Sequence, residues 1–384
     1  GDGHTLLPAI LSAVILTFSK AIGTFGTINY LGSPVQFYTL SSQLYMNINS
    51  RDTQTGFAMA ILMIIIASIA VFVNQKLIGS RKSYATIGGK GGRSTLIGLG
   101  KVGRPVITAA LFVFFAVGII MPIVILVMES FMLKEGIYSL DNFTLHYWIG
   151  ESNPQIMEGL PGIFKNDEFI NSLFNSLRLT LVNGVFGTIF GQLLGYITAK
   201  GRGRLHGKLV EQLVFIPYLI PSVAFGGIYL SMFSQPQQIF GVTLVPALYG
   251  TFALLTLVSV VKHLPFAARA GTSNMLQISG ELEEAATIEG AGFFRRFVKI
   301  VFPLSKGGFI SGFMLIFVSI MKELDLIILI MTPTTSTLPY LAFRYQNGNS
   351  PQASDCVAIV MFSIVFLVYA IANLSGKADL AKSM

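Results

Sequence analysis

Long apolar segments separated by polar loops make up most of this chain. A helix that crosses a bilayer needs about 20 consecutive, mostly apolar residues. Segments of this length occur at Leu6–Ile28, Thr55–Val73, Pro105–Val127, Phe169–Thr198, Leu209–Phe233, Pro246–Leu264, Phe309–Met331 and Asp355–Leu374. The pattern therefore predicts an all-α, polytopic membrane protein with about eight spans.

The composition supports this assignment. Of the 384 residues, 53% are hydrophobic and 11% are charged, whereas an ordinary soluble domain has about 25% charged residues. These values exclude a soluble enzyme, a disordered chain and a nucleic-acid-binding domain. The net charge of +8 is then expected from basic cytoplasmic loops, with no nucleic acid as a partner.

The loops alternate in charge, and this predicts how the helices are oriented. Loop 74–104 contains seven Lys or Arg residues and no acid, and turn 200–208 contains four more basic residues. Loop 128–168 instead contains seven acids and two lysines. Because cytoplasmic loops carry an excess of Lys and Arg, we expect 74–104 and 200–208 inside and 128–168 outside. Eight crossings then place both termini and the loop 265–308 in the cytoplasm.

The beginning and the end of the chain resemble each other. The first stretch contains, in order, Lys20, Ser33-Pro34, Thr39-Leu40, Tyr45 and a helix from about Thr55. The second contains Lys322, Thr332-Pro333, Thr337-Leu338, Phe343 and a helix from Asp355. Such self-similarity is typical of an internal repeat, and chance similarity between two apolar helix pairs is the alternative.

The repeat predicts a protein of two homologous halves with about twelve helices in total. On this interpretation, residues 1–75 are the last two helices of an incomplete N-terminal half and 76–104 form a basic cytoplasmic linker. Residues 105–384 are then a complete six-helix C-terminal half. The rest of the first half would precede Gly1.

No pattern for catalysis or for a resident metal stands out. The chain has one cysteine, Cys356, and four scattered histidines without ligand spacing. We find no convincing Ser/His/Asp arrangement, and the glycine-rich stretch 88–95 lacks the Lys-Ser or Lys-Thr pair of a phosphate loop. We therefore expect no catalytic residues, no metal ligands and no cofactor bound by this chain.

The segment 279–303 has the pattern of two short helices joined at a glycine. Ser279 is a suitable N-cap, and the glutamates that follow it favour the start of a helix dipole. Gly290 suits a left-handed C-terminal cap, a second helix is expected from Phe293, and Pro303 ends it. Two alanines leave a low-profile face, so this cytoplasmic element reads as a docking helix.

The same segment resembles the EAA motif of binding-protein-dependent ABC importer permeases. The matching residues are Glu284, Ala285, Ala286, Gly290, Ile300 and Pro303. The resemblance implies a type I ABC importer transmembrane fold in a bacterial inner membrane, with this loop as the coupling helix. It also implies two copies of an ATPase subunit, which hold ATP and Mg, and a periplasmic or lipid-anchored substrate-binding protein.

The cargo follows from a narrower resemblance. The fused two-half layout with a basic linker is most similar to iron(III)-type permeases. Permeases for sugar phosphates, phosphonates, thiamine and polyamines share much of the pattern and stay open as alternatives. An ion-gradient-driven secondary transporter is a further alternative, but it requires neither the motif nor an ATPase.

Ionisable residues within the apolar segments are candidates for the translocation pathway. Charged groups at membrane depth are costly and usually face a bundle interior or a cavity. The candidates are Lys20, Lys322, Glu323 and Asp325, together with the helix-breaking Pro217 and Pro221. We expect Lys322 and Asp325, three residues apart, to share a helix face and pair. Such a pair could line the pathway or merely stabilise packing, and two lysines near the pathway favour an anionic or anion-escorted solute.

Overall fold

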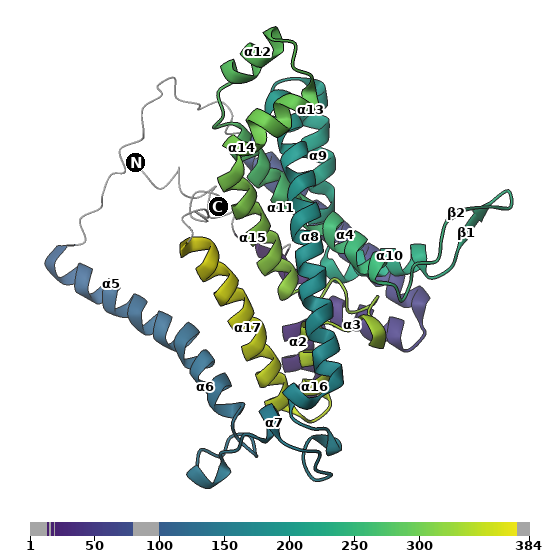
Figure 1. Cartoon of the computed structure of the whole chain (residues 1–384). Coiled ribbons are helices and arrows are strands. Elements are labelled where there is room, and N and C mark those ends of the chain that lie inside the picture. Colours follow the sequence, from purple (N-terminus) through teal and green to yellow (C-terminus); the bar gives the residue numbers. More distant parts are fainter. Residues whose placement is uncertain (1–13, 15–16, 19, 80–99, 375–384) are drawn as a thin grey trace.

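Helices make up most of the computed structural model, which describes residues 14, 17, 18, 20–79 and 100–374 (Figure 1). Five helical runs among these residues are long and apolar enough to cross a membrane. They are α4 (Thr53–Gly79), the continuous run of α5 (Gly100–Phe115), η3 (Ala116–Ile120) and α6 (Met121–Glu129), α8 (Asp167–Lys200), α11 (Phe252–Met275) and α17 (Pro351–Leu374). The prediction of an all-α, polytopic membrane protein is confirmed.

Two further spans are bent. Helix α9 (Leu205–Leu219) meets α10 (Ser222–Phe233) at 98°, and the run Phe293–Leu304 meets α15 (Lys306–Met321) at 78°. Counting each bent pair as one span gives up to seven among the described residues. About half of the first predicted span, Leu6–Ile28, and most of the linker 76–104 lie outside those residues.

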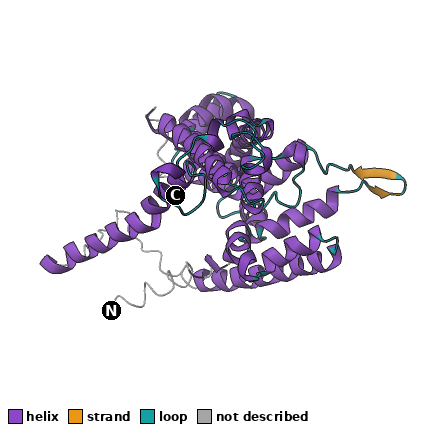
Figure 2. Cartoon of the chain, turned by 90° about the horizontal axis from the view of Figure 1, so that it is seen from below, coloured by secondary structure: helices purple, strands orange, loops and turns teal. Residues whose placement is uncertain are grey.

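Short elements connect these helices. Near the start they are α2 (Gly26–Gly32), η1 (Ser33–Val35) and α3 (Leu40–Asn49). Before α8 they are η4 (Leu140–Asn142), α7 (His146–Ile149), η5 (Met157–Gly159) and η6 (Ile163–Lys165). After α10 they are the antiparallel hairpin β1 (Gln237–Ile239) and β2 (Val242–Val245), α12 (Glu281–Ile288), α13 (Phe293–Arg296), η7 (Phe297–Val301), α14 (Phe302–Leu304), η8 (Pro333–Thr335) and α16 (Leu338–Asn347). The hairpin projects sideways from the helical body (Figure 2).

Three predicted span boundaries need correction. The segment predicted as Leu209–Phe233 is two helices with a break at Ile220, and the one predicted as Pro246–Leu264 runs from Phe252 to Met275. The segment predicted as Phe309–Met331 leaves the helix at Met321. Its remaining apolar residues, 326–331, form turns that are buried against neighbouring helices. Their hydrophobicity therefore reflects burial in the protein core, and not contact with lipid.

The two ends of the molecule carry different elements. Figure 1 places α12 and α13 at one end, next to the point where α8 turns into α9, and α7 at the opposite end. This arrangement puts the basic turn 200–208 and the segment 279–303 on one side and the acidic loop 128–168 on the other. The relative placement agrees with the charge pattern, while the assignment of sides to cytoplasm and exterior stays a prediction.

The two similar stretches of sequence fold alike. Helices α3 and α16 each have ten residues and each begins after a threonine in extended conformation, Thr39 or Thr337. A long apolar helix, α4 or α17, follows in both cases. The matched aromatic residues Tyr45 and Phe343 contact each other, with ring centroids 6.2 Å apart. The division into two halves stays an interpretation, which these elements support.

Helix α8 packs against α11 at a backbone-to-backbone contact. A Cβ atom added at Gly191 would lie 2.4 Å from Cβ of Ala267, and one added at Gly195 would lie 2.4 Å from the backbone of Gly271. Small residues at such a crossing let two helices approach closely, which is how many membrane helices associate. The crossing fixes α11 and, through it, the cavity described below.

A larger side chain at this crossing is expected to destabilise the protein. Gly195→Leu has no space to enter, so we expect overpacking to cost about 1–3 kcal/mol and to lower the midpoint of thermal unfolding in detergent. Gly118→Leu is the matched control, because a Cβ atom there meets nothing within 4 Å. Equal unfolding midpoints for the two variants would contradict the close packing described here.

Candidate functional site

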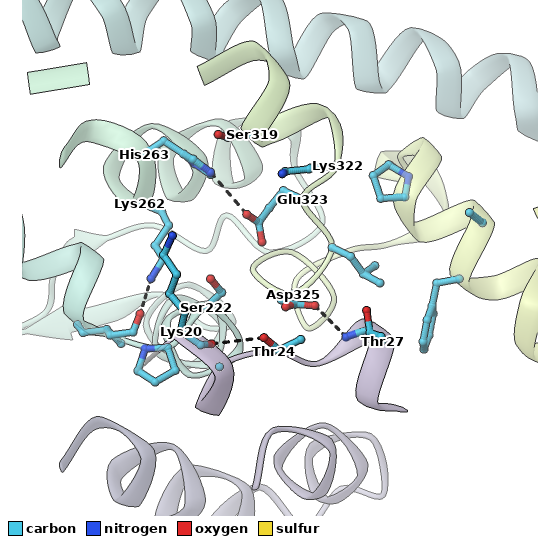
Figure 3. A pocket seen from close by; sticks show the side chains of 18 of the residues that line it. Lys20, Thr24, Thr27, Ser222, Lys262, His263, Ser319, Lys322, Glu323 and Asp325 are labelled. Atoms are coloured by element: carbon cyan, nitrogen blue, oxygen red, sulfur yellow. Dashed lines mark hydrogen bonds and ion pairs between the residues drawn. The ribbon is translucent and has the colours of Figure 1, made fainter. Parts of the chain in front are cut away.

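A cavity of about 730 Å³ lies where the beginning and the end of the described chain meet (Figure 3). Residues from several elements form its walls. They include residues 20–30, the break between α9 and α10, α11 at Lys262 and His263, the turn after α15, and α16. The cavity is therefore lined by residues from both of the similar stretches of sequence.

Most of the predicted pathway residues line this cavity. They are Lys20, Pro221, Lys322, Glu323 and Asp325. The sixth, Pro217, does not line it, but its carbonyl accepts a hydrogen bond from a lining residue, Lys262. The structure brings these residues together, and their role in translocation stays a prediction.

The predicted Lys322–Asp325 pair is wrong. Helix α15 ends at Met321, so a spacing of three residues does not place these two side chains on one helix face. The Asp325 carboxylate instead accepts hydrogen bonds from the backbone N–H groups of Phe25 (3.1 Å) and Gly26 (3.0 Å). This contact joins the turn after α15 to the start of α2.

Glu323 also has partners that the sequence did not reveal. One carboxylate oxygen accepts from the backbone N–H of Leu326 (3.0 Å), and the other lies 3.5 Å from Nε2 of His263. Nδ1 of His263 donates to the carbonyl of Ser259 (2.9 Å). The His263 ring therefore links the carboxylate of Glu323 to the backbone of α11. His263 is 4% exposed, so this contact is internal to the protein.

The break between α9 and α10 is held by Lys262 on α11. Pro221 has no N–H group and therefore leaves the carbonyl of Pro217 without its helical partner. Nζ of Lys262 donates to this carbonyl (2.9 Å) and to the carbonyl of Ile220. Lys262 lies within a predicted apolar segment, 41 residues after Pro221, and was not among the predicted pathway residues. A charged residue in such a segment is the signal that could have identified it.

The predicted docking segment forms the expected pair of short helices. Helix α12 begins at Glu281, one residue later than the predicted N-cap at Ser279 implies. Gly290 has a φ of +80° at the end of the turn and the next helix begins at Phe293, both as predicted. Ser279 lies one residue before the N-cap position, which Gly280 occupies, and its hydroxyl accepts from the N–H of Glu281 (3.3 Å).

The motif residues divide between two places. Glu284 and Ala285 are exposed on α12, and Ala286 is half-buried. Ile300 lies in the π-helical turn η7 and Pro303 in α14, directly before the 78° bend into α15. Glu284 and Ala285 are therefore accessible at the surface, while Ile300 and Pro303 lie in the segment that leads into the bend.

An apolar face of α12 is exposed at the end of the molecule. Leu282, Ala285 and Ile288 recur at a spacing of three residues, and we call them the exposed face of α12. Leu282 is 50% exposed and Ile288 is 86% exposed. Contiguous exposed apolar residues mark sites of interaction with another protein, so this face is suited to docking.

Glu283 on the opposite face anchors α12 to α8. Its carboxylate lies 2.7 Å from Nζ of Lys200 and accepts a hydrogen bond from the hydroxyl of Tyr196 (2.6 Å). Glu283 is 7% exposed. In the sequence Glu283 looks like the other glutamates at the start of the helix, because nothing local distinguishes a glutamate that has a tertiary partner.

Comparison with known proteins gives a consistent picture. Residues 187–378 match the family described as "Binding-protein-dependent transport system inner membrane component". The chain is 22% identical over 372 residues to the ferric transport system permease protein FbpB of Actinobacillus pleuropneumoniae, which covers 94% of this chain and 50% of that protein. It is 26% identical over 212 residues to the sulfate transport system permease protein CysT of Synechocystis, which covers 53% of this chain and 71% of that protein.

A solved structure has the same fold. The crystal structure of a bacterial ABC transporter involved in the import of the acidic polysaccharide alginate aligns with a TM-score of 0.55 at 16% identity, over 70% of this chain and 94% of that one. The chain spans about half the length of the ferric relatives that it matches.

The anchor between α12 and α8 can be tested directly. We expect Glu283→Ala to free α12, because the variant leaves Lys200 and Tyr196 without their partner. Amide hydrogen exchange across residues 281–289 should accelerate about tenfold, which corresponds to the loss of hydrogen bonds to a charged group. Glu281→Ala, on the exposed side of the same helix, serves as control and should leave the exchange rates nearly unchanged. Equal rates in the two variants would show that Glu283 does not hold the helix.

Proposed function

The chain belongs to the family of binding-protein-dependent transport system inner membrane components, and from this premise we propose that it is the permease subunit of an ATP-driven importer. The observation that carries the proposal is the exposed face of α12, on a helix that is fixed to a membrane-spanning helix by Glu283. A helix with one anchored side and one exposed apolar side can bind a partner and pass on its motion. ATP hydrolysis then resides on the partner, not on this chain.

We further propose that two ATPase subunits and an extracytoplasmic binding protein complete the transporter. The binding protein would deliver the solute to the end of the molecule that carries α7, opposite α12. Nucleotide can move the helices only if each nucleotide state binds one conformation of the permease better than another. The exposed face of α12 is where that difference in binding free energy would act.

Iron(III) is the cargo that we propose first. The ferric permease aligns with 94% of this chain, whereas the sulfate permease aligns with 53%. The first alignment thus also reaches the residues that we interpret as part of a first copy. Sugar phosphates, phosphonates, thiamine and polyamines stay as alternatives within the same transporter class.

The docking role predicts the effect of a charge on α12. We expect Ile288→Glu to weaken binding of the ATPase subunit at least tenfold, because a carboxylate would be buried without a partner, and to abolish ATP-dependent uptake. Co-purification and uptake into proteoliposomes measure the two effects. Leu140→Glu is the control: Leu140 is 90% exposed but lies in the loop at the opposite end. Full ATPase binding by Ile288→Glu would contradict the docking role.

The cargo requires a separate measurement. We expect cells with the complete transporter to accumulate radioactive iron(III) in an ATP-dependent manner, and an excess of sugar phosphate, phosphonate, thiamine or spermidine not to compete. Competition by one of these solutes, together with absent iron uptake, would replace iron(III) by that solute and leave the importer assignment intact.

A further inference from the structure

We propose that the cavity of about 730 Å³ binds an anionic oxygen group, such as a phosphate, sulfate or carboxylate, between Lys20 and Lys322. The binding itself follows from the charges and hydrogen bonds of the cavity. Its part in transport rests on the proposed function, since an anion held there would be the solute or a group that the solute carries.

The acidic residues of the cavity are already bonded within the protein. The carboxylate of Asp325 accepts from two backbone N–H groups of the first copy. The carboxylate of Glu323 lies against the His263 ring and accepts from the N–H of Leu326. Neither carboxylate forms a salt bridge with a lysine of the cavity among the described residues, and each accepts hydrogen bonds from backbone N–H groups instead.

The lysines of the cavity are in a different situation. Lys262 is 9% exposed, and its ammonium group donates hydrogen bonds to two carbonyls at the helix break. Lys20 and Lys322 are exposed, and within the described part of the chain neither forms a salt bridge. Nζ of Lys20 lies 5.8 Å from the ring centroid of Tyr218, another lining residue. Among the described residues, two ammonium groups therefore lie at the cavity without a salt-bridge partner.

The surroundings of these lysines suit an anion. Figure 3 shows Lys20 on the wall formed by the first copy and Lys322 next to Glu323 on the wall formed by the second. Hydroxyl groups lie between and around them, on Thr24, Thr27, Ser222 and Ser319. Ammonium and hydroxyl groups both donate hydrogen bonds, and bonds from a charged donor to an anionic oxygen are the stronger kind. The side chains thus supply the donors that a phosphate, sulfate or carboxylate group accepts.

An anion site in the cavity would limit the chemical form in which iron(III) could be the cargo of this chain. A bare trication would be repelled by the two lysines, at a cost that rises as water is displaced from the cavity. Iron(III) bound to citrate or phosphate presents anionic oxygens on its outside and meets the donors instead. The inferred cargo is therefore an anion or an anionic metal complex, and free ferric ion and polyamines are disfavoured.

Binding to the purified chain tests the inference without ATP or partners. Equilibrium dialysis of the chain in lipid nanodiscs would compare radioactive phosphate, sulfate, citrate and iron(III) citrate with spermidine. We expect at least one anion to bind, and Lys20→Gln or Lys322→Gln to lower its affinity about tenfold each, as for the loss of one charged hydrogen bond. Lys208→Gln, an exposed lysine at the α8–α9 end, is the control and should leave the affinity unchanged.

A charge reversal guards against a variant that simply misfolds. With unfolding midpoints matched to the wild type, Lys20→Glu/Lys322→Glu should lose anion binding and gain spermidine binding. Anion affinity that is unchanged in the glutamine variants, or spermidine binding by the wild type, would overturn the proposal. Citrate alone and iron(III) citrate distinguish a free anion from a metal complex as the bound species.

Two further outcomes distinguish the loss of the anion site from the loss of the proposed importer function. ATP-dependent uptake that persists in Lys20→Gln/Lys322→Gln would remove the anion site and leave the importer. Anion binding in a chain that recruits no ATPase subunit would remove the importer and leave the site.

Discussion

A bilayer offers no water to backbone groups, so every broken helix within it needs a partner for each freed carbonyl. The break between α9 and α10 meets this requirement through Lys262, whose ammonium group reaches the carbonyls of Pro217 and Ile220. Because α11 supplies this lysine, the position of the break is tied to the glycine crossing of α11 with α8. These hydrogen bonds support the 98° bend between α9 and α10. The bend in turn forms one wall of the cavity and sets the direction of α10.

The cavity depends on contacts between distant parts of the sequence. Asp325 binds the backbone at Phe25 and Gly26, about three hundred residues earlier. The rings of Tyr45 and Phe343 also bring the two similar stretches of sequence into contact. Charged residues from both stretches line the cavity. The charge of the cavity therefore depends on how these stretches meet, more than on the composition of either.

Periodic and local signals in the sequence predicted much of the fold and of the site. Long apolar runs located α4, α8 and α17, and the glycine with positive φ at 290 marked the end of α12. The end of α15 at Met321 was not predictable in this way, because residues 326–331 are apolar for burial in the core and look like a continuing span. The partners of Glu283 and Glu323 were likewise invisible, since each depends on a side chain from another helix.

Helix α8 runs as one continuous helix between the end of the molecule that carries α12 and the end that carries α7. Its 34 residues run without a break, which at 1.5 Å per residue makes it about 50 Å long. One end carries Tyr196 and Lys200, which hold α12, and near the other end Ser172 and Glu168 bond to Ser336 and Arg344 around α16. A tilt of only about 5° at the first end would displace the second by about 4 Å at this length. A small rotation of α8 at the end that holds α12 would therefore move its other end by more than the length of a hydrogen bond.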